Sequence, residues 1–237
     1  MADPLSPSDK PVTRRCLVVV VLLAVWLAAM AVVVKTSLDR LVVPPWGNPV
    51  GEGLSAEVAG DTQVGQRFTA PLPGLYRIEV TLDRATARSP HPITFHLKTD
   101  PAAADDLWTA QLSTEEVQTG VPYRFEFPPL RNSKGQTFYF YLESADSVPG
   151  DAIAVRYSPG ATLDGASACL NGEAVAGDLQ FHSFYTLRTR DKADLLLTRL
   201  AEGRPYLLGV KGFYVGLALI YALVLTLFLL QTARAIR

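Results

Sequence analysis

Hydrophobic residues follow two different patterns along this chain. Near each end they form an unbroken apolar run, residues 17–34 and residues 212–230, without a charged residue. Between the runs they alternate with polar residues, as in residues 76–82 (YRIEVTL). An unbroken run of this length predicts a helix that crosses a membrane, because a rise of about 1.5 Å per residue covers most of a hydrocarbon core about 30 Å thick. The alternation predicts β-strands with one buried face.

Basic residues beside the two runs predict how the chain crosses the membrane. The N-terminal tail, residues 1–16, carries three basic residues, and the C-terminal tail, residues 231–237, carries two. Lys and Arg that flank a span stay on the cytoplasmic side. We therefore predict two transmembrane helices, both tails in the cytoplasm, residues 35–211 outside it, and the lipid bilayer as a partner. Cys16 and Cys169 would then lie on opposite sides of the membrane and form no disulfide.

The apolar runs leave two alternatives open. Residues 29–31 (AMA) resemble the cleavage site of a signal peptide, so the first run is either a retained span or a cleaved leader. Gly212 and Gly216, and likewise Ala24 and Ala28, place small residues four positions apart. Such pairs let helices approach closely and predict helix packing, although small residues are also common in apolar helices generally.

The segment between the runs divides into three parts. Residues 35–60 are rich in Pro and Gly and predict a linker. Residues 61–190 carry short alternating strands separated by turn signals, which predicts an antiparallel β-sandwich or jelly roll. Residues 191–211 form a connector whose first part, residues 191–202, predicts a short juxtamembrane helix closed by a glycine. The predicted fold class is mainly β, flanked by two transmembrane α-helices.

The buried face of the sandwich follows from the same alternation, because successive side chains of a strand point to opposite faces. Apolar residues on one face of each strand form the predicted core. They are Phe68, Tyr76, Ile78, Val80, Leu82, Phe95, Leu97, Tyr123, Phe125, Phe127, Phe138, Phe140, Leu142, Ile153 and Val155. We expect these side chains to meet between two sheets.

Composition and motifs exclude several classes of function. The chain has 22 Lys and Arg against 23 Asp and Glu, a net charge of −1, which excludes a strongly basic nucleic-acid binder. The sequence contains no GxSxG elbow, no HExxH motif and no phosphate-binding glycine loop. We therefore predict a protein that is not an enzyme, needs no cofactor and has no nucleic-acid partner.

Three acidic residues supply the candidate metal site. Asp100, Asp105 and Asp106 lie in one predicted loop, and carboxylate oxygens are the ligands that calcium prefers. Their spacing does not match a known calcium loop, and the alternative is a solvated acidic turn. His91 and His96 lie five residues apart without a third ligand nearby in the sequence, so we expect surface histidines.

Aromatic residues supply the candidate ligand-binding site. Tyr139 and Tyr141 alternate with Phe138 and Phe140 in one strand, so one pair faces out of the core or into a second layer. Trp108 lies beside the acidic loop. Because aromatic faces bind sugar rings or partner proteins, we predict that Tyr139, Tyr141 and Trp108 bind a ligand. The alternative is that the linker or residues 178–185 cover the two tyrosines.

Several short motifs of the predicted strands and turns carry a family resemblance. They are residues 66–70, 75–80, 125–129, 132–135, 138–140, 171–173 and 177–181. Together they resemble extracytoplasmic sandwich domains of bacterial envelope membrane proteins, over about residues 60–205. Such domains are similar to galactose-binding-like jelly rolls, and some accompany membrane glycosyltransferases of surface-polysaccharide pathways. The resemblance implies a bacterial inner or plasma membrane, and the absence of an N-x-S/T sequon agrees with a bacterial source.

These observations lead to one expected function with two alternatives. We expect a non-enzymatic membrane protein whose extracytoplasmic sandwich binds a glycan or a partner protein in cell-envelope assembly. The first alternative is a structural accessory subunit whose spans pack against a larger membrane complex. The second is a hydrolase with an unrecognised site, which would require two carboxylates facing each other across a cleft.

Overall fold

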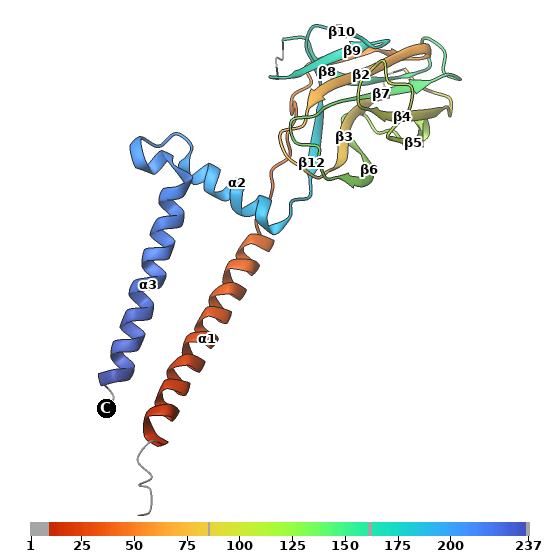
Figure 1. The fold of residues 1–237 in the computed structure, drawn as a ribbon. Coiled ribbons are helices and arrows are strands. Elements are labelled where there is room, and N and C mark those ends of the chain that lie inside the picture. The colour runs from red at the N-terminus through yellow and green to blue at the C-terminus, as the bar shows by residue number, and fades with distance from the viewer. Residues whose placement is uncertain (1–9, 85, 161–162, 236–237) are drawn as a thin grey trace, which may run out of the picture. The chain divides into compact units, whose positions relative to one another are not determined.

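The computed structural model describes residues 10–84, 86–160 and 163–235. The chain forms two compact units. One unit combines the two ends of the chain, up to Val42 and from Arg188 onward, and the other is Val43–Leu187. The α-helices belong to the first unit and the strands to the second (Figure 1).

The helices and strands of the described residues follow one another in a simple order. The helical unit holds α1 (Lys10–Asp39), α2 (Thr189–Ala201), a 3-10 turn η2 (Tyr206–Gly209) and α3 (Lys211–Ala235). The other unit holds β1 (Gly53–Val58), β2 (Gly60–Thr69), β3 (Leu75–Asp83), β4 (Pro92–Lys98), β5 (Trp108–Ser113), a 3-10 turn η1 (Thr114–Glu116), β6 (Pro122–Leu130), β7 (Thr137–Ser144), β8 (Ile153–Ser158), β9 (Ala166–Leu170), β10 (Glu173–Val175), β11 (Asp178–Leu179) and β12 (Phe181–Tyr185).

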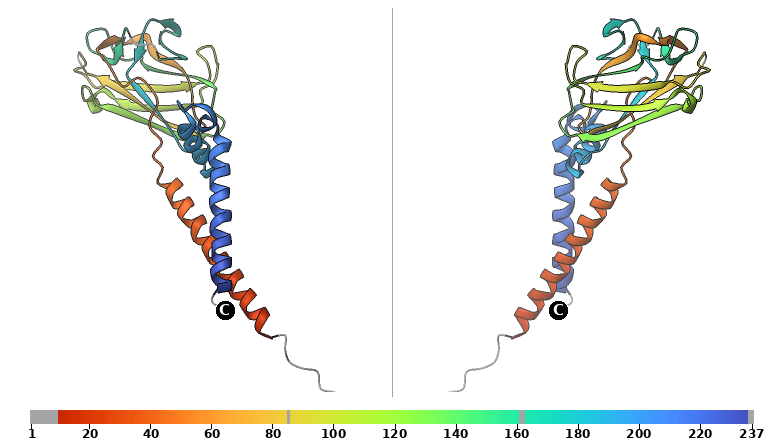
Figure 2. Two further views of the ribbon diagram at one scale, coloured as in Figure 1. Left: turned by 90° about the vertical axis from the view of Figure 1, so that its left-hand side faces the viewer. Right: turned by 90° about the vertical axis from the view of Figure 1, so that its right-hand side faces the viewer.

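The strands form two antiparallel sheets, which confirms the predicted mainly-β class. The first sheet has the order β1-β8-β3-β12, with β11 beside β8 and β6 beside β3. The second sheet has the order β10-β9-β2-β7-β4-β5. Figure 2 shows the β unit from two further sides. Most neighbouring strands are distant in the sequence, so long-range pairing holds this unit together.

Aromatic side chains fill the space between the two sheets. Phe95 of β4 stacks on Phe125 of β6, with ring centroids 4.1 Å apart and planes 9° apart. Phe68 of β2 meets Phe181 of β12 at 5.4 Å. Each pair joins a strand of one sheet to a strand of the other, and such contacts add to the free energy gained by burying the rings.

The predicted core residues are buried with two exceptions, Tyr76 and Tyr123, which are half-buried. The register of β3 is irregular between Leu75 and Arg77, and Leu75 fills the core position instead, with no exposed surface. Tyr123 lies on β6, which pairs with a strand on one side, and its hydroxyl donates to the carbonyl of Glu116. The alternation is therefore wrong at Tyr76, whereas Tyr123 lies opposite the buried Val80, on the predicted face, but is only half-buried.

The predicted linker, residues 35–60, contains regular structure at both ends. Helix α1 continues to Asp39, and β1 lies within residues 53–58. Between them Trp46 pairs with Ser183 of β12, and its ring lies 6.0 Å from that of Phe68. The Pro- and Gly-rich composition predicted a linker, but part of this segment packs against one end of the aromatic core.

Gly47 shows why this segment needs a glycine. Its φ is +153°, and a Cβ atom there would lie 2.2 Å from the carbonyl oxygen of Phe181. No side chain fits at that distance, so glycine lets the segment run directly against β12.

Helix α2 lies where the sequence predicts a short helix, residues 191–202, and its place beside a membrane stays a prediction. Helix α2 ends at Ala201, and Gly203 follows with a φ of +69°, the left-handed conformation that commonly terminates helices. Lys211 at the start of α3 contacts α2 through an ion pair of 2.7 Å to Asp194.

Helix α3 has the length and composition of a membrane span. Its stretch Lys211–Thr232 has 22 residues and a mean hydropathy of 2.5, and none of it is buried. Among the described residues this is the one helix that satisfies those criteria. Helix α1 covers the first apolar run, residues 17–34, and the span predicted there stays a prediction.

Candidate binding sites of the β-sandwich

Tyr139 and Tyr141 lie together on the outer face of β7 but are not exposed. Their relative exposures are 2% and 7%, and their rings stack at 5.4 Å. His96 of β4 stacks on Tyr141 at 4.4 Å with an interplanar angle of 4°. The three rings form a column, which we call the aromatic column. The tyrosines are buried beside His96 and Cys169 of their own sheet, whereas residues 178–185 belong to strands of the other sheet.

The imidazole at the end of the aromatic column lies between two carboxylates. His96 Nδ1 is 2.8 Å from Asp106 Oδ2, and His96 Nε2 is 3.2 Å from Glu143 Oε1. Gln63 Nε2 donates to the other oxygen of Glu143 at 2.9 Å. Both ring nitrogens of His96 are thus engaged by carboxylates of other segments. His96 is therefore a structural crosslink between β4, β7 and the following loop.

Burial keeps both tyrosine hydroxyls protonated. Desolvation, with the negative charges of Asp106 and Glu143, raises the pKa of Tyr141 to about 12. Desolvation also raises the pKa of Tyr139, whose hydroxyl faces the Gly172 backbone without completing a hydrogen bond. Neither phenol can act as a base near neutral pH. Both rings contribute packing to the outer face of the sheet.

Trp108 does not join the two tyrosines. It pairs with Leu97 across β4 and β5, and residues directly opposite one another in a sheet share a face. Leu97 is fully buried on the inner face. Trp108 therefore lies on the face opposite to the aromatic column, and the three aromatic residues predicted from the sequence do not form one site.

The three loop aspartates point to different partners. Asp100 pairs with Arg67 at 3.0 Å, and Asp106 pairs with His96, whereas Asp105 is exposed. Within the described part of the chain, no group of three or more His, Cys, Asp or Glu side chains is placed to hold a metal ion. The geometry gives the calcium site predicted at these residues no support.

The single cysteine of the sandwich is buried beside the aromatic column. Cys169 is 3% exposed and is not in a disulfide. Burial raises the pKa of its thiol, which disfavours the reactive thiolate. The side chain of Cys16 lies outside the described residues. Cys169 is therefore a packing residue of the outer face.

The small residues predicted to pack helices have no helix against them in the described residues. A Cβ atom at Gly216 would meet nothing within 4 Å, and at Gly212 its nearest neighbour would be Val210 at 3.9 Å. Ala24 and Ala28 of α1 are exposed. Helix packing through these positions stays a prediction.

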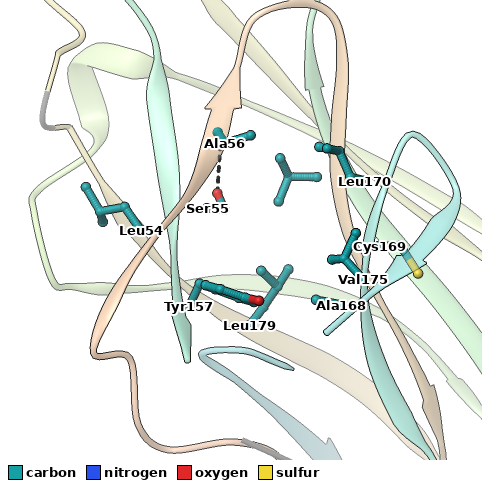
Figure 3. Close-up of a pocket in the computed structure, with 10 residues that line it drawn as sticks. Leu54, Ser55, Ala56, Tyr157, Ala168, Cys169, Leu170, Val175 and Leu179 are labelled. Atoms are coloured by element: carbon teal, nitrogen blue, oxygen red, sulfur yellow. Dashed lines mark hydrogen bonds between the residues drawn. The ribbon is translucent and has the colours of Figure 1, made fainter. Parts of the chain in front are cut away.

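A pocket of about 190 Å³ lies between the two sheets and is lined in part by the edge strands β1 and β10 (Figure 3). Its lining is mostly aliphatic and comes from strands of both sheets. The lining residues are Leu54, Ser55, Ala56, Val64, Tyr157, Ala168, Cys169, Leu170, Val175 and Leu179. We call this the edge pocket.

The polar atoms that line the edge pocket are already bonded within the protein. Tyr157 donates its hydroxyl to the carbonyl of Ala176. Ser55 Oγ donates to the Ala56 carbonyl at 2.7 Å and accepts from the backbone N–H of Val155 at 3.0 Å. With these groups satisfied, the pocket offers a ligand mainly apolar contacts.

The rim of the edge pocket exposes aliphatic side chains. Leu54 is 42% exposed, Leu170 is 36% exposed and Val175 is 41% exposed. Leu170 and Val175 lie on the inner face of their sheet, as their pairing with Val64 and Ala168 shows. The apolar core of the sandwich is thus open at this edge, where the first sheet does not cover β9 and β10 completely.

Sequence reasoning missed the edge pocket. Leu54 and Ala56 lie in the segment assigned to the linker, although Leu54, Ala56 and Val58 alternate with polar residues there. That short alternation could have predicted the strand β1. The remaining walls come from strands that are distant in the sequence, so no local pattern could bring them together.

Comparison with known proteins adds no assignment to these sites. A scan against protein-family models finds no match, and a search of curated proteins finds no similar sequence.

Proposed function

We propose that this protein is a non-enzymatic, membrane-anchored binding protein. In this proposal α1 and α3 cross a bacterial inner or plasma membrane, and the sandwich lies outside the cytoplasm. There it binds a partner protein in cell-envelope assembly, through the edge pocket. The single observation that carries the proposal is the opening of the apolar core between β1 and β10.

The chemistry of the edge pocket favours a protein partner over a glycan. Sugar rings need accessible aromatic faces and free polar groups, whereas the aromatic column is buried and the pocket lining is aliphatic. An aliphatic side chain fits these walls. The two edge strands beside it offer backbone groups to an extended segment, a common mode of peptide recognition. We therefore infer that an extended segment of a partner places an aliphatic side chain in the pocket.

The reactive groups of the sandwich support a binding role over catalysis. The Cys169 thiol and the two phenols are buried with raised pKa values. His96 has both ring nitrogens engaged by carboxylates. None of these groups is placed to act as a free base or nucleophile on a substrate.

The proposal is tested by photocrosslinking with the full-length protein in the membranes of its source cells. A photoreactive residue replaces Leu54 or Leu170 on the rim, and Lys134, an exposed turn residue, is the control position. We expect the same discrete protein adduct from both rim positions and none from the control. Ala56→Arg should abolish the adduct, because the arginine occupies the pocket mouth.

Two outcomes would contradict the proposed binding site. One is an adduct that forms equally from Lys134 and from the rim. The other is the absence of any rim adduct while the same full-length protein retains a polysaccharide in pull-down, which would favour the glycan alternative.

A further inference from the structure

The turn between α2 and α3 exposes apolar side chains to an unusual degree. Tyr206 is 94% exposed, Leu207 is 70% exposed and Val210 is 54% exposed. Leu196 and Leu200 of α2 are also exposed, and residues four apart share one face of a helix. We call these five side chains the juxtamembrane surface. Exposed apolar side chains gathered within one short segment, residues 196–210, indicate a site of interaction with a protein or a membrane.

This turn is held in a defined conformation. The backbone N–H of Val210 donates to the Leu207 carbonyl at 3.1 Å and closes η2. The hydroxyl of Tyr214 lies 2.9 Å from the carbonyls of both Leu200 and Leu208, so it ties the end of α2 to η2. Hydrogen bonds therefore fix the backbone that carries these apolar side chains.

Tyr206 is held in a conformation that is rare for its residue type. Its φ is +54°, in the left-handed region that residues other than glycine seldom adopt. Its ring makes almost no contact with the rest of the protein. The exposed ring is therefore available to a contact outside the protein.

The juxtamembrane surface continues directly into the candidate span. Lys211, the first residue of α3, follows Val210, and the 22-residue apolar stretch starts there. Tyrosine is enriched at the level of lipid headgroups, where its ring is apolar and its hydroxyl is hydrated. Arg204 flanks the surface with a positive charge that suits lipid phosphates, whereas Lys211 at the other end is paired with Asp194. The chemistry therefore matches the boundary between headgroups and acyl chains.

We propose that the juxtamembrane surface inserts into the outer leaflet of the bilayer at this boundary, so that α2 lies on the membrane and α3 enters it. This inference rests on the proposed role of α3 as a span. Its partner is the lipid surface itself. A protein partner that covers the same side chains is the competing outcome of the test.

The test measures the depth of single positions in lipid bilayers. The full-length protein, with Cys16→Ser and Cys169→Ala, carries one new cysteine labelled with an environment-sensitive fluorophore. It is reconstituted in vesicles of phosphatidylcholine and phosphatidylglycerol that contain a spin-label quencher, either near the headgroup or at the middle of the acyl chain. The labelled positions are Leu207→Cys in the juxtamembrane surface, Ile220→Cys in α3 and Lys134→Cys in the sandwich.

We expect a graded result from the three positions. Leu207→Cys should be quenched several-fold more by the shallow quencher than by the deep one. Ile220→Cys should show the reverse preference, and Lys134→Cys should respond to neither. The three labelled positions are exposed, so their substitution should leave the fold intact. Cys169 is buried, so thermal unfolding of the Cys16→Ser, Cys169→Ala background checks that the sandwich still folds.

The failures of the two proposals are distinguishable. If Ile220→Cys is quenched and Leu207→Cys behaves like Lys134→Cys, the span stands and the insertion of the juxtamembrane surface is wrong. A blue-shifted but unquenched Leu207→Cys probe also overturns it, because protein would then cover the site. If Ile220→Cys escapes both quenchers, α3 is not in the bilayer and the proposed anchoring is wrong.

Discussion

Tyr141, His182 and Asp151 show how the surroundings of one side chain decide its charge. Burial raises the pKa of Tyr141 to about 12. Burial lowers the pKa of His182, although the opposing Glu79 of β3 offsets part of this effect. Hydrogen bonds from the Ser89 side chain and from nearby backbone N–H groups hold the pKa of the Asp151 carboxyl far below its usual range. The folded state thus favours neutral Tyr141 and His182 and a charged Asp151.

Because the pKa of His182 is lowered in the folded state, we predict that the protein loses stability in mild acid. Its pKa in the folded state lies below the ordinary value of 6.5, so the unfolded chain binds the proton more readily. Stability is therefore fully present above pH 6.5 and falls as the pH drops through 6.5 toward the folded-state pKa. Urea unfolding of the full-length protein and of His182→Asn at several pH values measures this contribution.

The asparagine variant should lose less stability than the wild type over that acidic interval. His91 and His96 are present in both proteins, so the difference between the two curves isolates His182. A difference that does not change with pH would contradict the assignment.

Strands β2 and β11 are joined by a buried polar link between the two sheets. Gln66 has no exposed surface, and its Nε2 donates to Asp178 Oδ1 at 2.7 Å. Its Oε1 accepts from the backbone N–H of Leu179, a wall of the edge pocket, at 2.8 Å. Asp178 Oδ2 also accepts from the backbone N–H of Leu163 at 2.8 Å. One amide therefore satisfies two buried groups of the opposite sheet.

Gln66→Leu should destabilise the sandwich by about 1–3 kcal/mol, because it leaves a carboxylate oxygen and a backbone N–H buried without these partners. Chemical unfolding of the full-length protein measures the change. The matched control is Gln111→Leu, since Gln111 is exposed on β5 and its replacement should alter the free energy of unfolding by less than about 0.5 kcal/mol. Equal effects of the two substitutions would refute the role given to Gln66.

Individual elements also show which parts of this fold a sequence can predict. The alternation around Ile78 and Phe125 predicts buried strand faces because it is local and regular. It fails at Tyr76, where the irregular register of β3 moves Leu75 into the core. It is ambiguous at Tyr139, where both faces of the strand are apolar and the covering residues belong to other segments. Contacts between distant segments, which no local pattern encodes, decide such positions.

At the scale of the whole molecule, we predict an orientation of the chain across the membrane that cysteine labelling can measure. Lys134→Cys, in a chain with Cys16→Ser and Cys169→Ala, should react with a membrane-impermeant maleimide in intact spheroplasts. A cysteine added after Arg237 should react only after lysis, because flanking basic residues keep that tail in the cytoplasm. The opposite labelling pattern would refute the predicted orientation, and labelling of both positions before lysis would refute the two-span arrangement.

The pairing of Trp46 with Ser183 has a mechanical consequence. The chain enters the β unit near Val43 and leaves it near Leu187, and between these points Trp46 and Ser183 exchange backbone hydrogen bonds of 3.0 and 2.6 Å. The segments that connect the β unit to the rest of the chain at both ends are thus paired with each other close to where they leave it. A pull that separates Val43 from Leu187 would load these two bonds together with the bond from the Thr186 N–H to the Gly74 carbonyl, before it reached the aromatic core.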